Sequence, residues 1–184
     1  MPWHDLIKGP LESLFMQWLC GPKLILKISP AFSKASEEKT GDDKFYARVE
    51  VTNVKRKTAY GCQGYLIGLD EWNEERQRFE TVFSDTRPLI WSRDPHTQKL
   101  DISKKIPRIF DVVLYNRGHA GLDLQLWSEG GPVLRPPELQ AFREKSGKFR
   151  FRVRVSAFDL PPKEIAFKVT WDGKNWPPKL EEGM

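Results

Sequence analysis

The strongest constraint on the fold is residues 149–156, FRFRVRVS, where apolar and polar side chains alternate at every step. Successive side chains of a β-strand point to opposite faces, so a period of two is typical of a strand with one buried face. We therefore expect four apolar side chains of this segment to point into a core: Phe149, Phe151, Val153 and Val155.

The same period recurs along most of the chain after Pro22. Further strands are predicted at residues 23–28, 45–53, 59–69, 100–102, 109–116, 122–127 and 163–172, and residues 33–44 are predicted to be a polar loop. Between residues 70 and 98 the pattern is broken, with short apolar pieces at 79–83 and 88–91. The segments 148–158 and 163–172, joined by the sequence DLPP, form the clearest hairpin. Eight or nine short strands predict an all-β, antiparallel immunoglobulin-like β-sandwich over residues 23–173, with a closed barrel as the alternative.

Composition supports one globular domain of this kind. Hydrophobic residues make up 39% of the chain and aromatic residues 12%, which is more than a disordered chain carries. Seven tryptophans and eleven phenylalanines can fill the space between two facing sheets. The net charge of +5 makes acidic proteins and nucleic-acid backbones the partners to test.

Two segments carry a family resemblance. The sequence RVEVTNVKRKTAYGCQGYL, residues 48–66, resembles the paired strands of bacterial immunoglobulin-like sandwiches of the adhesion-related type. In those domains an alternating strand ends at Asn, here Asn53, and the next strand begins with a small residue, here Ala59. The sequence AFKVTWDG, residues 166–173, is similar to their last strand. The resemblance implies a binding or spacer module without catalysis.

Both ends of the chain are predicted to lie outside the sandwich. Residues 1–22 read as an appendage with a helix that starts at Pro10 and stops before Gly21 and Pro22. Because so short a helix is not stable alone, its apolar face must be buried on the domain, in a partner's groove or in a membrane surface. The candidate binding residues on that face are Leu11, Phe15 and Trp18. Residues 174–184 are predicted to be a loosely ordered tail, and residues 136–147 to add a helical turn or two.

The sequence offers little raw material for catalysis. The three histidines and two cysteines lack zinc-site spacing, and no nucleophile, phosphate-loop or dinucleotide motif is present. The carboxylates of residues 37–43 alternate with lysines, which favours a solvated loop over a calcium site. Cys62 falls in an apolar strand and is expected to be a buried thiol, with pairing to Cys20 left open. We therefore predict a non-enzymatic protein without metal or cofactor, and the lack of a signal peptide or apolar span predicts a cytoplasmic location.

The polar positions of the opening segment form the second candidate site. If the apolar residues face the core, Arg150, Arg152 and Arg154 form a row on the other face, with about 7 Å between neighbours. That distance is close to the phosphate spacing of a nucleic-acid strand. On the neighbouring strand, however, the matching face offers three charged residues for cross-strand interactions: Glu164, Lys168 and Asp172.

Three roles are open for this arginine row: a solvated face, a docking surface for protein, or a nucleic-acid surface. The nearest aromatic candidates for base stacking are Tyr46 and Trp176, while Trp72 is expected either to cover the core edge or to act as a binding anchor. The leading hypothesis is a module that binds another protein, or itself, through the amino-terminal helix or the arginine row. Nucleic-acid binding by Arg150, Arg152 and Arg154 is the alternative.

Overall fold

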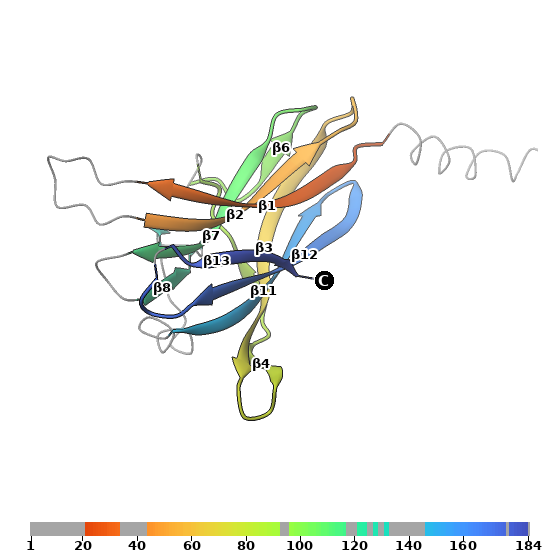
Figure 1. Cartoon of the computed structure of the whole chain (residues 1–184). Coiled ribbons are helices and arrows are strands. Elements are labelled where there is room, and N and C mark those ends of the chain that lie inside the picture. Colours follow the sequence, from red (N-terminus) through yellow and green to blue (C-terminus); the bar gives the residue numbers. More distant parts are fainter. Residues whose placement is uncertain are drawn as a thin grey trace, which may run out of the picture.

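The computed structural model describes residues 21–33, 44–92, 96–116, 121–124, 127–128, 131–132, 146–175 and 177–183. Within these residues the chain is all-β, and every pairing between its strands is antiparallel (Figure 1). This confirms the predicted all-β antiparallel class. The predicted helix with Leu11, Phe15 and Trp18, the helical turn at 136–147 and most of the polar loop at 33–44 lie outside the described residues.

The strands form two main sheets. The smaller sheet has the order β1, β2, β7, β8, with bounds Leu24–Ser33, Lys44–Asn53, Arg108–Asn116 and Gly121–Leu124. The larger sheet has the order β13, β12, β11, β3, β4, with bounds Lys179–Gly183, Leu160–Trp171, Gly147–Ala157, Ala59–Asn73 and Arg78–Phe83. Short strands β5 (Arg87–Pro88) and β6 (Leu100–Ile102) pair with β3, and β9 (Trp127–Ser128) pairs with β10 (Gly131–Pro132).

The alternation in the sequence decides which side chains are buried. In β11 the residues Phe149, Phe151, Val153 and Val155 are buried, as predicted, and the residues between them are less buried. In β2 the same alternation buries every second side chain. The buried side chains of both sheets belong to one hydrophobic cluster, so the two sheets share a single core.

Gly64 in β3 allows a close approach between the two sheets. A Cβ atom at this position would lie 2.3 Å from Cζ of Phe110, which belongs to β7 in the other sheet. The Phe110 ring cannot easily withdraw, because it stacks on the buried ring of Trp91 with a centroid distance of 3.8 Å. The absence of a side chain at Gly64 is therefore part of how the core packs.

We expect Gly64→Ala to lower the free energy of unfolding by about 2 kcal/mol through overpacking against Phe110. Urea unfolding of Gly64→Ala, Phe110→Leu and the double variant measures this effect. The smaller Leu side chain should relieve part of the clash, so the double variant should be more stable than the sum of the two single effects. Strictly additive effects would contradict the proposed contact.

Two predictions near the carboxyl terminus need correction. The tail predicted at 174–184 is wrong for residues 179–183, because they form β13 and pair with residues 166–170 of β12. Leu180 packs against the core there, which the prolines of this segment do not prevent. The turn of the β11–β12 hairpin is also shorter than predicted, because Ala157 already pairs with Leu160 and only Phe158 and Asp159 form the loop.

Cys62 is a free, buried thiol, as the strand pattern predicted. Burial raises its pKa to about 12, with a smaller contribution from the negative charge of Asp159. Because the thiolate is the reactive form, the native protein should expose almost no reactive sulfur at this position. In a Cys20→Ser variant, we expect slow labelling by a thiol reagent at pH 8 and complete labelling once denaturant is added. Rapid labelling of the native variant would show that the site opens.

Candidate binding face

The outer surface of β11 carries the three arginines predicted as a row. The side chains of Arg150, Arg152 and Arg154 are 34%, 41% and 40% exposed. Lys168 of β12 lies directly opposite Arg150 on the same face. We call Lys148, Arg150, Arg152, Arg154 and Lys168 the arginine face. The predicted orientation of the row is confirmed, while its role in binding stays a prediction.

The buried carboxylate of Asp70 contacts two arginines of the arginine face. Asp70 of β3 is only 1% exposed, and its Oδ2 accepts a hydrogen bond from Nε of Arg150 at 2.8 Å. Its Oδ1 accepts a hydrogen bond from the Thr81 hydroxyl at 2.9 Å and lies 3.6 Å from Nη2 of Arg152. One carboxylate therefore interacts with two guanidinium groups, and it fixes their positions on the sheet.

Cross-strand charge pairing is only partly as predicted. Arg154 pairs with Glu164 of β12 at 2.8 Å, which confirms the predicted cross-strand interaction of Glu164. Asp172 is not a partner of the row: its carboxylate accepts backbone hydrogen bonds from Asn175 and Lys174, which lower its pKa to about 2. Lys168 lies opposite Arg150 and also opposite Glu181 of β13. Lys148 pairs with Glu74 at 3.3 Å, so acidic side chains accompany both lysines of the face.

Arg152 is the least compensated arginine of the row. Its Nε is buried and has no hydrogen-bond partner among the described residues, and its nearest carboxylate oxygen is the one at 3.6 Å on Asp70. The side chain lies against Gly68 of β3, where a Cβ atom would be 2.4 Å from Nη2 of Arg152. Gly68 thus leaves space for the guanidinium to lie against the sheet, with part of its hydrogen-bonding capacity unused.

An aromatic pair borders the arginine face. Trp72 of β3 and Phe79 of β4 contact each other edge to face, with centroids 5.1 Å apart. Arg150 lies over the Phe79 ring at 4.7 Å, and Lys148 lies over the Trp72 ring at 5.3 Å. Tyr46, the aromatic proposed from the sequence, instead lies beside Arg48 on the smaller sheet, and Trp176 is outside the described residues.

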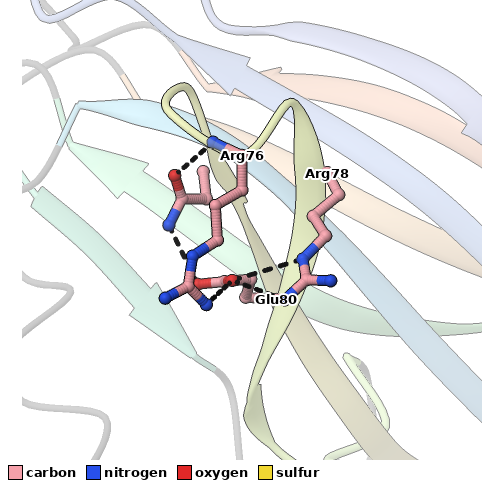
Figure 2. Close-up of polar contacts among 4 residues, drawn as sticks. Arg76, Arg78 and Glu80 are labelled. Carbon is pink, nitrogen blue, oxygen red and sulfur yellow. Dashed lines mark hydrogen bonds and ion pairs between the residues drawn. The ribbon is translucent and has the colours of Figure 1, made fainter.

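The β3–β4 hairpin continues beyond this aromatic pair and ends in a polar cluster (Figure 2). Glu80 pairs with Arg76 at 2.8 Å and with Arg78 at 3.3 Å, and it accepts a hydrogen bond from Asn73 at 2.9 Å. These contacts lower the pKa of Glu80, with the Asn73 hydrogen bond as the largest cause. Arg76 and Arg78 therefore already share a carboxylate and are weaker candidates for binding than Arg152.

Sequence reasoning missed Asp70 and Phe79 as members of this site. Asp70 lies in β3, whose pairing with β11 shifts in register between Arg152 and Val153. Phe79 lies in β4, whose pairing with β3 shifts in register between Leu69 and Asp70. A bulge changes which residues face each other without leaving a clear mark in the sequence. The density of charges in residues 69–80 was the available signal, but it does not say which face they occupy.

Among the described residues, no group of three or more His, Cys, Asp and Glu side chains is arranged to hold a metal ion. The described part of the chain also contains no helix that is long and apolar enough to span a bilayer.

The described part of the chain is an all-β protein of antiparallel sheets with a row of arginines on an outer face. No family model matches the sequence, and no curated protein matches it. Among solved structures, the chain is similar to a Bordetella pertussis protein provisionally named ApaA, at 12% identity and a TM-score of 0.35. That match covers 88% of this chain and 94% of the other, and a likeness at this level defines neither fold nor function.

Proposed function

We propose that this protein is a non-enzymatic, immunoglobulin-like β-sandwich module, and that its arginine face binds an acidic segment of another protein. The shared core between two antiparallel sheets supports the sandwich assignment. The observation that carries the binding proposal is Arg152, whose side chain is 41% exposed on β11 and whose Nη2 lies 3.6 Å from the nearer carboxylate oxygen of Asp70. Carboxylates are the natural ligands of such a group, because two parallel N–H···O bonds match their geometry.

Nucleic-acid binding is the second candidate, because aromatic rings do lie beside the cations. The rings of Phe79 and Trp72 are, however, already contacted by Arg150, Lys168 and Lys148. A base could stack on those ring faces only by displacing these cations. The face thus offers charge without free stacking surfaces, which favours an acidic protein segment.

Binding to defined anionic probes tests this proposal. Fluorescence anisotropy with a polyglutamate peptide and with a single-stranded oligonucleotide should show the tighter binding for the peptide. Arg152→Ala should weaken peptide binding by about fivefold, in line with the loss of one charge-assisted hydrogen bond. The matched control is Arg78→Ala, which removes an arginine that already pairs with Glu80 and should change little.

The outcome separates the candidate functions. Equal binding of Arg152→Ala and the parent protein would overturn the arginine face as the site. Tighter oligonucleotide binding with a steep dependence on salt would favour the nucleic-acid alternative. A Phe15→Asp, Trp18→Asp variant examines the other predicted contact surface, and sedimentation of that variant examines self-association.

A further inference from the structure

A second surface, at one end of the molecule, is independent of the arginine face. Three connections meet there: residues 54–58 between β2 and β3, residues 103–107 between β6 and β7, and residues 158–159 between β11 and β12 (Figure 1, upper right). Backbone hydrogen bonds hold them together. The amide of Lys105 donates to the carbonyl of Asn53 at 2.9 Å, and the amide of Phe158 donates to the carbonyl of Tyr60 at 3.0 Å.

Exposed apolar side chains gather at this end. Of the five large hydrophobic residues that are exposed in the described part of the chain, Val54, Ile106 and Phe158 lie on these connections and Tyr60 lies two residues after one of them. The fifth, Ile25, lies in β1 and pairs with Thr52, two residues before the first connection. Phe158 is 73% exposed and Ile106 is 53% exposed, and both occupy turns rather than strands. Scattered exposed hydrophobics are ordinary, but a group confined to one end indicates an interaction site.

Cations surround these apolar side chains. The exposed basic residues of this end are Lys23, Lys55, Arg56, Lys57, Lys99, Lys104 and Lys105. The connections 54–58 and 103–107 contain no acidic residue, while the connection 158–159 contains Asp159 beside Phe158. Of the nearby acids, Asp101 accepts a hydrogen bond from the Gly61 amide at 2.8 Å, so its carboxylate is engaged within the fold. We call this set of turns the basic apolar end.

The combination of cations and apolar side chains at the basic apolar end fits some classes of partner better than others. A nucleic acid would gain from the cations and from rings such as Tyr60, but it gains nothing from the aliphatic side chains of Val54 and Ile106. A protein partner would cover the apolar groups, but lysine is depleted in such interfaces. An anionic bilayer uses both features, because the headgroups attract lysines and the interfacial region accepts apolar side chains.

We propose that the basic apolar end binds the surface of an anionic bilayer, with Ile106 and Phe158 entering the interfacial region and the lysines contacting lipid phosphates and carboxylates. The start of β1 lies beside this end, because the amide of Val54 donates to the carbonyl of Lys23 at 3.0 Å.

Vesicle co-sedimentation of the full chain tests the proposal. The protein should bind vesicles of phosphatidylcholine with phosphatidylserine, and should not bind vesicles of phosphatidylcholine alone. Ile106→Ser with Phe158→Ser should weaken binding more than about tenfold, since two large apolar side chains no longer enter the interface. Arg56→Glu with Lys104→Glu should weaken binding by more than about 25-fold, at about fivefold for each lost cation and with added repulsion from the two new carboxylates.

The matched control reverses two charges at the far end of the same strands. β3 and β12 both begin at the basic apolar end, so Arg76 and Lys174, which follow their other ends, are distant from it. Arg76→Glu with Lys174→Glu should bind vesicles like the parent protein. Circular dichroism and thermal melting of each variant separate lost binding from lost folding.

Three results would overturn the proposal: equal binding to both kinds of vesicle, no binding to either while an oligonucleotide binds, or a control variant as weak as Arg56→Glu with Lys104→Glu. A different result would assign this end to a second copy of the chain. In that case the parent protein would self-associate without binding vesicles, and the Ile106→Ser, Phe158→Ser variant would no longer self-associate. Arg152→Ala should bind vesicles normally, so failure of the arginine-face proposal and failure of this one are distinguishable.

Discussion

Asn53→Ala should lower the free energy of unfolding by about 3 kcal/mol, although the residue is polar and no ion pair is involved. Asn53 is fully buried at the end of β2. Its Oδ1 accepts hydrogen bonds from the amides of Lys23 at 3.2 Å and Lys55 at 3.1 Å. Its Nδ2 donates to the carbonyls of Lys57 at 2.7 Å and Ile102 at 3.0 Å.

These four bonds use the full donor and acceptor capacity of the side-chain amide and connect three segments: the start of β1, the turn after β2 and the end of β6. An alanine would leave the buried Ile102 carbonyl and three partly buried backbone groups without this partner, and each such group carries a desolvation penalty. Asn53→Asp should also destabilise, because a carboxylate replaces two donors and faces two carbonyl oxygens.

Equilibrium unfolding in urea measures the effect, with Asn73→Ala as the matched control. Asn73 also makes side-chain hydrogen bonds, to the Arg76 amide at 3.0 Å and to Glu80 at 2.9 Å, but these lie on the hairpin tip and compete with water. Its replacement should cost less than about 1 kcal/mol. Similar losses for the two variants would contradict the assigned role of Asn53.

Asp70→Ala is the second large effect, at about 3 kcal/mol. The substitution removes a buried carboxylate and leaves the guanidinium of Arg150 and the hydroxyl of Thr81 without their partner. We place the loss at the lower end of the range for buried ion pairs, because the Arg150 side chain is 34% exposed and water can solvate it in part.

Thermal or urea unfolding measures the loss of unfolding free energy for Asp70→Ala, with Glu164→Ala as the matched control. Glu164 makes the same kind of contact, with Arg154, but its side chain is 54% exposed, so its replacement should cost less than about 1 kcal/mol. The substitution Asp70→Asn keeps the shape and removes the charge, and it should recover part of the Thr81 hydrogen bond. A loss for Asp70→Ala no larger than that for Glu164→Ala would show that Asp70 does not organise the face.

The sequence determined most of the features that follow from the period-two alternation of side chains in a strand. Alternation in residues 149–156 predicted both the buried apolar set and the outward row of Arg150, Arg152 and Arg154, because side-chain direction in a strand follows from the backbone alone. The same rule placed β2, and the turn signal after Asn53 located its end. The Arg154–Glu164 pair could be expected because the two residues face each other across a local hairpin.

Tertiary structure decided what depends on register between strands distant in the sequence. Asp70 meets Arg150 across a separation of 80 residues, and register shifts in the β11–β3 and β3–β4 pairings lie on either side of it. The same holds for the basic apolar end, where residues near positions 25, 54, 106 and 158 meet although each looks like an ordinary turn or strand end. Local sequence fixes the direction of a side chain, but only the packed sheets fix its neighbours, because pairing between distant strands is set by the core as a whole.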